Sequence, residues 1–326
     1  MQRLAAFALL GFVLVNGPIV ALAEPPLRLE AKIPLGNVAG RIDHLAVDLG
    51  RKRLFVAELG NDSVGVIDFK EAKVIARIGG LKEPQGVAYE PSTEMLYVTN
   101  AGDGSVRLFQ GIGLKPSGKI DLGEDADNIR IDASHPRVLI GYGNGAIAII
   151  DPGTRAKTGV VILDGHPEGF QTDGTRIFAN VPDGRHVAVI EVAEIATHAR
   201  WRFGERGRNF PMAIDEEQGW LVSVTRGPAE LLRFELGNGA LLSRTDTCED
   251  ADDVSIDAKH HRVYISCGEG FLDIFEQRNG HERIARIPTA RGARTSFFSP
   301  TLDRLFLAVR ATSDEPAAIW VYEPQP

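Results

Sequence analysis

The chain repeats one pattern seven times, with neighbouring copies about 42 residues apart. Each copy opens with a short apolar run, and the residue that ends the run is acidic or carries a hydroxyl group. We call these residues the anchors; they are Asp48, Glu90, Asp132, Asp173, Asp215, Asp257 and Ser299. Such a regular period is typical of propellers and solenoids, which repeat one supersecondary unit. The anchors also allow residues that lie far apart in the sequence to be assigned to equivalent positions.

One copy of the pattern reads as four strands. In the first copy, apolar runs at 45–48, 54–57, 64–68 and 74–78 are separated by short polar turns. Runs of this length that are rich in valine and isoleucine predict a four-stranded antiparallel meander. None of them has the period of a helix, which excludes helical solenoids. The sequence therefore predicts an all-β fold, a seven-bladed β-propeller of four-stranded antiparallel blades.

The two ends of the chain are expected to share the last blade. After Ser299 there are only two further apolar runs, at 305–309 and 319–322, so the seventh copy lacks its fourth strand. An extra strand is predicted at 29–35, and RLEAKIPLG at 28–36 matches the fourth-strand text RIARIPTARG at 283–292. We therefore expect the N-terminal strand to complete blade seven and close the ring. An open array with a frayed end is the alternative.

The first residues do not follow the repeat. Gln2 and Arg3 precede an apolar stretch at 4–15, and the small-residue pattern ALA stands at 21–23. This order predicts a cleaved signal peptide at 1–23 and a periplasmic or secreted protein, with one propeller domain at 24–326. A membrane anchor is disfavoured because the apolar run is interrupted well before about 20 residues. We expect no membrane span after cleavage.

The formal net charge is −8, so the chain gains nothing from attraction to phosphates, and no nucleic-acid partner is expected. The chain has two cysteines, Cys248 and Cys267. In an exported protein an even count predicts a disulfide, and two buried free thiols are the alternative. Both cysteines fall at the same end of blade six, Cys248 in the loop that enters the blade and Cys267 at the end of its second strand. The first and second strands are expected to pair in antiparallel order, which brings the two cysteines close together.

The sequence YVTN at 97–100, followed by GDGSV at 102–106, resembles the signature of the YVTN-repeat seven-bladed β-propeller family. Variants stand in the first copy (LFVAELGNDSVGVID, 54–68) and in the sixth (VYISCGEGFLDIF, 263–275). The resemblance implies the same fold and an exported protein that we expect to be a monomer. It implies little about function, because related propellers bind ligands, carry quinone or haem chemistry, or act as lactonases and lyases.

Equivalent positions near the start of each copy should meet at one mouth of the central channel. The residues five before each anchor are Asp43, Gln85, Asp127, Glu168, Phe210, Asp252 and Arg294, and the following position adds His44, Asn128 and Asp253. A hydrated polar funnel would have this composition. A binding site would have it too, and we predict as ligand-binding residues Asp43, His44, Gln85, Asp127, Asn128, Glu168, Asp252, Asp253 and Arg294.

Four of these acids would meet without an equal number of neighbouring cations. Carboxylates crowded in this way raise one another's pKa or recruit a hard cation such as calcium. Resemblance to lactonase propellers, whose channel metal has Glu, Asn and Asp ligands, suggests a divalent ion at Glu58, Asn100, Asn128 and Asp252. His44 beside Asp43 is a candidate general base, although a hydrogen-bonded loop histidine would look the same.

Other polar residues are expected to be structural. The anchor acids should cap tight turns by accepting backbone N–H groups. His260 and His261 fall in a turn at the opposite end and are interpreted as surface residues.

Three functions remain open from the sequence. The first is a binding protein that takes a small ligand or a protein partner at the channel mouth, favoured because the common catalytic motifs are absent. The second is a metal-assisted hydrolase or lyase. The third is an accessory to redox chemistry that holds a quinone or haem. The sequence favours a protein without enzymatic activity.

Overall fold

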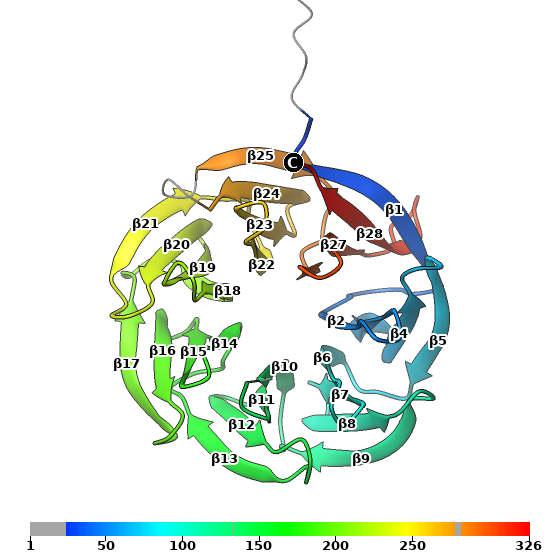
Figure 1. The fold of residues 1–326 in the computed structure, drawn as a ribbon, viewed down its shortest axis with the longest axis horizontal. Coiled ribbons are helices and arrows are strands. Elements are labelled where there is room, and N and C mark those ends of the chain that lie inside the picture. The colour runs from blue at the N-terminus through cyan, green and yellow to red at the C-terminus, as the bar shows by residue number, and fades with distance from the viewer. Residues whose placement is uncertain (1–23, 133, 278–281) are drawn as a thin grey trace, which may run out of the picture.

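The computed structural model describes residues 24–132, 134–277 and 282–326. In these ranges the chain forms seven four-stranded antiparallel sheets arranged as a ring around a central opening (Figure 1). The predicted all-β, seven-bladed propeller is confirmed. The predicted signal peptide at 1–23 lies outside the described residues. No helix in the described part is long and apolar enough to cross a membrane.

Six blades are built from consecutive strands. Their bounds are, for blade 1, β2 (Leu45–Asp48), β3 (Arg53–Glu58), β4 (Ser63–Asp68) and β5 (Lys73–Gly79); for blade 2, β6 (Pro84–Glu90), β7 (Met95–Asn100), β8 (Ser105–Gln110) and β9 (Lys115–Asp121); for blade 3, β10 (Ala126–Asp132), β11 (Arg137–Tyr142), β12 (Ala146–Ile150) and β13 (Lys157–Ile162); for blade 4, β14 (Phe170–Thr172), β15 (Arg176–Val181), β16 (His186–Glu191) and β17 (Ala196–Arg202); for blade 5, β18 (Arg208–Asp215), β19 (Trp220–Arg226), β20 (Glu230–Glu235) and β21 (Leu241–Asp246); and for blade 6, β22 (Ala251–Asp257), β23 (Arg262–Cys267), β24 (Phe271–Glu276) and β25 (Arg283–Pro288). A short 3₁₀ turn, η1 (Leu59–Asn61), follows β3.

Blade 7 combines the two ends of the chain. It contains β26 (Ser296–Ser299), β27 (Arg304–Val309) and β28 (Ala317–Pro324), and its outer strand is β1 (Leu27–Gly36). β1 pairs with β28 in antiparallel order, from Leu27 opposite Pro324 to Gly36 opposite Ala317. The first and last strands therefore lie side by side on the ring (Figure 1). This confirms that the N-terminal strand completes the seventh sheet.

The hydrophobic core is divided among the interfaces between neighbouring blades. Between blades 2 and 3, for example, Tyr97 and Val106 pack against Ile140 and Ala148, and all four are buried. Seven such clusters follow one another around the ring. Each sheet buries both faces only because a neighbour lies on either side, which explains why one repeat is not stable alone.

The anchors close the turns after the innermost strands, as predicted. Asp48 Oδ1 accepts a hydrogen bond of 3.1 Å from Arg51 N, and Asp257 Oδ1 accepts one of 3.1 Å from His260 N. Ser299 Oγ accepts one of 3.3 Å from Leu302 N. The recurring acid or hydroxyl is therefore a turn cap rather than part of a site.

Candidate functional site

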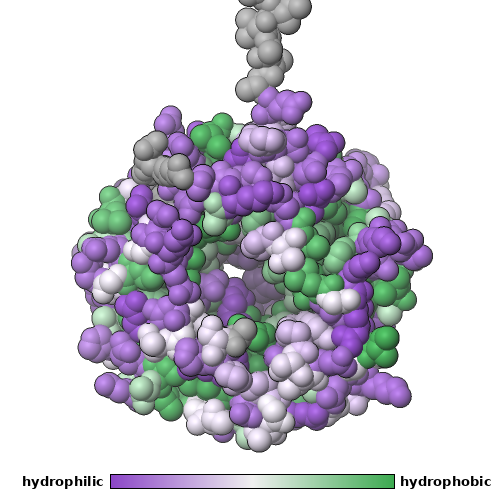
Figure 2. All heavy atoms as spheres, viewed as in Figure 1, coloured by the Kyte–Doolittle hydropathy of each residue, from purple (hydrophilic) through white to green (hydrophobic). Residues whose placement is uncertain are grey.

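A cavity of about 800 Å³ occupies the middle of the ring, and its walls are the innermost strands of the seven blades. Figure 2 shows the corresponding opening in the centre of the molecule. We call the end where the innermost strands begin the mouth. All nine residues that the sequence predicted for ligand binding line this cavity: Asp43, His44, Gln85, Asp127, Asn128, Glu168, Asp252, Asp253 and Arg294. Their assignment to ligand binding stays a prediction.

Irregular backbone at the mouth explains why consecutive residues both line the cavity. In β10 the register shifts between Ala126 and Ile129, so that Asp127 and Asn128 are left out of the ladder. β6, β18 and β22 have similar shifts near their starts. A bulge of this kind re-aims side chains that a regular strand would send to opposite faces.

A further ring of residues lies deeper in the channel, two positions before the anchors. All seven line the cavity: Ala46, Ala88, Arg130, Gln171, Ala213, Ser255 and Phe297. The sequence analysis did not use this position, although the repeat would have identified it. Only Arg130 in this ring is charged, and three of the other members are alanines. The wall therefore changes from charged at the mouth to mainly apolar farther in.

The carboxylates at the mouth are paired with more cations than the sequence suggested. Asp43, which is 2% exposed, lies 2.6 Å from Arg41 Nη2. Asp252 lies between two arginines, with Oδ1 2.5 Å from Arg226 Nη2 and Oδ2 3.0 Å from Arg294 Nε. The expected excess of unbalanced acids is therefore wrong for this side of the mouth. Burial would raise the pKa of Asp252, but Arg294 and then Arg226 bring it below its usual range.

His44 is held between two carboxylates. Its Nδ1 lies 3.8 Å from Asp253 Oδ2, and its Nε2 lies 3.7 Å from Asp43 Oδ1. Burial alone would lower the pKa of His44, but Asp253 and then Asp43 raise it to about 10. The pKa of Asp43 rises to about 6, chiefly through burial. The raised pKa favours the protonated form of His44 near neutral pH, which suits a charge-balancing partner of Asp253 and Asp43 better than a general base.

Blades 3 and 4 contribute a second polar group, with His166, Asp127 and Glu168. His166 Nδ1 lies 2.6 Å from Gly143 O, and its Nε2 lies 3.5 Å from Asp127 Oδ2. Burial would lower the pKa of His166, but its pairing with Asp127 and Gly143 raises it to about 9. Glu168 makes no ion pair or side-chain hydrogen bond with the described residues. Burial, followed by the charge of Asp127, raises its pKa to about 7.

Arg130 is the charged group deepest in the channel. Its Nη1 donates to Ile129 O at 2.8 Å and to Asn128 Oδ1 at 3.2 Å. No carboxylate of the described residues lies within 4.0 Å of its guanidinium nitrogens, although Asp253 and Asp127 are close enough to influence it. Burial lowers the pKa of Arg130. The cavity therefore contains a partly buried cation whose remaining donors point to no internal anion.

Two of the four predicted metal ligands lie outside the cavity lining. Glu58 is 0% exposed and is bound by Arg77 and Ser63. Asn100 is also fully buried, and its side chain bonds only to backbone groups, including Lys82 N at 3.0 Å. Both residues end the second strand of their blade, where they stabilise the loop that follows. Asn128 and Asp252 do line the cavity, but each already accepts a hydrogen bond from an arginine.

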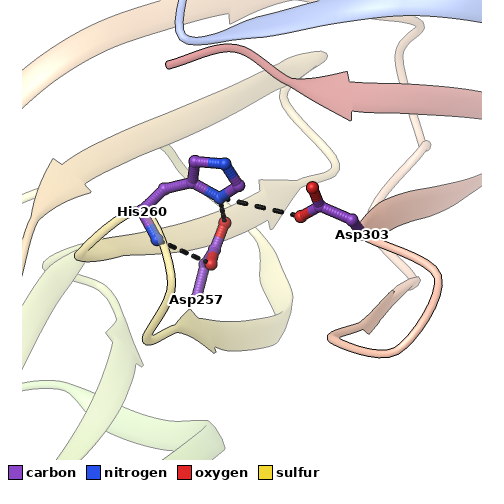
Figure 3. A group of neighbouring side chains, drawn as sticks. All are labelled: Asp257, His260 and Asp303. Carbon is purple, nitrogen blue, oxygen red and sulfur yellow. Dashed lines mark hydrogen bonds and ion pairs between the residues drawn. The ribbon is translucent and has the colours of Figure 1, made fainter.

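Among the described residues, one group of side chains is close enough together to hold a metal ion, and it lies at the end of the channel opposite the mouth. Asp257, His260 and Asp303 meet where the turns of blades 6 and 7 adjoin (Figure 3). His260 Nδ1 lies 2.7 Å from Asp257 Oδ2, and the same oxygen accepts a hydrogen bond of 2.6 Å from Tyr264 Oη. The interpretation of His260 as a surface residue is wrong, because its side chain is only 12% exposed. The carboxylate of Asp257 is already saturated by protein donors, which fits a structural role.

The predicted disulfide is present. Cys248 and Cys267 are bonded, with their Cα atoms 5.8 Å apart, and both are fully buried. Ala251 pairs with Cys267 across β22 and β23, so the bridge joins the loop entering blade 6 to the end of its second strand. It therefore fixes the segment that carries Asp250 and Asp252 to the mouth.

Comparisons with known proteins identify the fold but no family. No protein-family model matches the chain, and no match was found among curated proteins. A solved structure of hydrazine synthase from Kuenenia stuttgartiensis superposes with a TM-score of 0.75, over 87% of this chain and 97% of that one. The two sequences are 17% identical, so the likeness supports the propeller fold alone. The similarity to YVTN-repeat proteins remains a resemblance.

Proposed function

We propose that this chain is an exported binding protein, periplasmic or secreted, whose central cavity takes up a small charged molecule. The observation that carries the proposal is the presence of two unpaired charged groups in one cavity. Among the residues that the structure describes, no carboxylate forms an ion pair with Arg130, and no side chain donates to the carboxylate of Glu168. Polar and charged groups without partners in a partly desolvated cavity are costly, and a ligand with complementary groups would relieve that cost.

The size and lining of the cavity agree with this proposal. A volume of about 800 Å³ falls in the range of small-molecule sites. Phe210 stacks beneath Arg226, with the guanidinium carbon 3.9 Å from the ring centre, and this pair adds an apolar surface beside the charges. A small organic molecule that carries at least one ionised group suits this combination better than a macromolecule. The buried disulfide supports export.

The two other functions draw less support. The metal-assisted hydrolase loses Glu58 and Asn100 as ligands, and its remaining candidates are engaged by arginines. A redox accessory has no separate observation in its favour, because the similarity to hydrazine synthase extends to the fold alone.

Thermal unfolding in the presence of separate panels of small carboxylic acids, amines and amino acids tests the binding function. We expect at least one panel to raise the melting temperature of the wild-type protein in a saturable way. Arg130→Met and Glu168→Gln should remove or change this response. Two exposed residues outside the cavity lining provide matched controls, Arg206→Met and Glu216→Gln, and these should respond like the wild type. Equal responses in all five proteins would refute binding in the channel.

A further inference from the structure

Three arginines from two neighbouring blades meet at the mouth where blade 7 adjoins blade 1: Arg41, Arg294 and Arg310. Thr295 holds their segments together. Its backbone oxygen accepts a hydrogen bond of 3.0 Å from Ala308 N, and its hydroxyl donates one of 3.2 Å to Ile42 O. Each arginine lies one or two residues from one of these bonded positions. The arginines are therefore fixed near one another by the backbone rather than by chance contacts of long side chains.

These arginines have too few carboxylates. Arg294 pairs with Asp252 and Asp250, at 3.0 and 2.8 Å, and Arg41 pairs with Asp43 at 2.6 Å. Arg310 makes no ion pair or side-chain hydrogen bond with the described residues. Its Nε is buried and unpartnered, as is the Nε of Arg41. Burial lowers the pKa of Arg310, and the positive charges of Arg294 and Arg41 lower it further.

The repeat shows what is missing. Arg226 stands eleven residues after its anchor Asp215, and Arg310 stands eleven after Ser299, so the two are equivalent. Arg226 contacts two acids of the next blade, with Nη2 2.5 Å from Asp252 Oδ1 and Nε 3.5 Å from Asp250 Oδ1.

The blade that follows Arg310 differs at one of these two positions. The residues equivalent to Asp252 and Asp250, five and seven before the anchor Asp48, are Asp43 and Arg41. Arg41 therefore stands where the second acid would be. Arg41 also forms an ion pair with the remaining acid, Asp43. The junction between blades 7 and 1 keeps the arginine of the pattern but has lost its counterion.

We propose that Arg310 and Arg41 form an oxyanion site at the channel mouth, which binds a carboxylate or sulfate-like group in the place that Asp250 occupies beside Arg226. Guanidinium groups present forked N–H donors that match such oxygens and do not lose their charge near neutral pH. The site would receive the anionic group of a small molecule that enters the channel. In this respect the inference rests on the proposed function and adds the class of its ligand.

Calorimetric titration with inorganic sulfate, against chloride at constant ionic strength, tests the site. We expect saturable binding of one sulfate per chain. Arg310→Gln removes the unpaired guanidinium and should weaken binding at least about ten-fold, the effect of one charge-assisted pair. Arg41→Asp restores the acid found in blade 6, so the protein itself should satisfy Arg310 and sulfate binding should be lost to a similar extent. Arg291→Gln changes an exposed arginine of the same loop region and should bind sulfate like the wild type.

The two variants keep the test decisive if one of them fails to fold, because Arg41→Asp rebuilds a pair that already exists elsewhere in the ring. The inference is overturned if the wild type shows no saturable binding, or if both variants bind as tightly as the wild type. Equal weakening in Arg291→Gln would also overturn it, since general charge would then explain the effect. Sulfate binding without any response in the small-molecule panels would leave the oxyanion site standing and refute uptake into the channel.

Discussion

Arg77 Nε donates a hydrogen bond of 2.7 Å to Glu58 Oε2, and Arg77 Nη2 donates one of 3.0 Å to Oε1 of the same carboxylate. The pair joins the outer strand β5 to the end of β3 across β4. Gly65 lies between them on β4, where a Cβ atom would be 2.6 Å from Glu58 Oε1. A glycine is therefore required for the carboxylate to reach the arginine. This forked contact explains why Glu58 is buried inside blade 1 and does not line the cavity.

Glu58→Gln should destabilise the fold and leave the metal content unchanged. The substitution leaves Arg77 beside a neutral group, and we expect a loss of roughly 2–3 kcal/mol in the free energy of unfolding. Urea denaturation and elemental analysis of the purified protein measure the two effects. Glu71→Gln, in an exposed turn of the same blade, is the matched control and should change stability little. A stoichiometric metal that disappears in Glu58→Gln would restore Glu58 as a ligand.

His166 makes stability depend on pH. Its pKa is raised in the folded state from an ordinary 6.5 to about 9, so its contribution is complete below pH 6.5 and is lost as pH rises through about 9. His166→Gln should therefore be less stable than the wild type at pH 6, by up to about 3 kcal/mol, and the difference should shrink towards zero above pH 9. Denaturation midpoints between pH 5 and pH 10 measure this window.

His198, which is exposed on β17, provides the control for this experiment. His198→Gln should follow the wild-type pH profile throughout. A gap between His166→Gln and the wild type that stays constant from pH 6 to pH 10 would show that lost packing, rather than protonation, is responsible.

Removal of the disulfide should loosen blade 6. The bridged cysteines are separated by 19 positions in the sequence. For a loop of this length, the chain-entropy relation gives a contribution of about 3 kcal/mol to the free energy of unfolding. Cys248→Ala with Cys267→Ala should lower the free energy of unfolding by about this amount. Because the same segment carries Asp250 and Asp252, their ion pairs with Arg226 and Arg294 should loosen as well. Two reactive thiols in denatured, unreduced wild-type protein would contradict the bridge.

Deletion of residues 24–36 should open the ring. It removes β1 and leaves β28 with an unpaired edge, a typical starting point for aggregation. We expect loss of solubility or of cooperative unfolding, measured by sedimentation and urea denaturation. Deletion of residues 1–23 alone is the control and should leave both properties unchanged. A protein lacking 24–36 that unfolds as cooperatively as the intact chain would refute the importance of this closure.

The architecture was predictable because each part of it depends on a local pattern that recurs. Equivalent positions in seven copies revealed the blades, the turn-capping role of residues such as Asp48, and the incomplete seventh sheet. The position of the cavity residues followed from the same alignment. The cysteines could be paired because their places in the repeat put one in the loop entering blade 6 and the other at the end of its second strand, at the same end of the blade.

The site chemistry was less predictable because it depends on which side chains contact one another, and the repeat gives the positions of residues but not their partners. Arg130 was overlooked because it lies two positions before its anchor, a position that was not compared. Gln171 has the same position in the next blade and also lines the cavity. Arg41 lies outside the two positions that were compared, so the acids at the mouth seemed to lack cations. Glu58 was misplaced because the pattern gives the end of a strand but not the partner, Arg77, towards which its side chain turns.

The sharing of blade 7 between the two ends of the chain has a consequence for how the protein is made. In blades 1 to 6 every strand pairs with one that neighbours it in the sequence, so each sheet can form as soon as its own strands have been synthesised. β1 is synthesised before the other described strands, whereas its partner β28 is synthesised after them. Until β28 has been synthesised the first strand therefore lacks its native partner, and a nascent chain cut short before β28 cannot form the native seventh sheet.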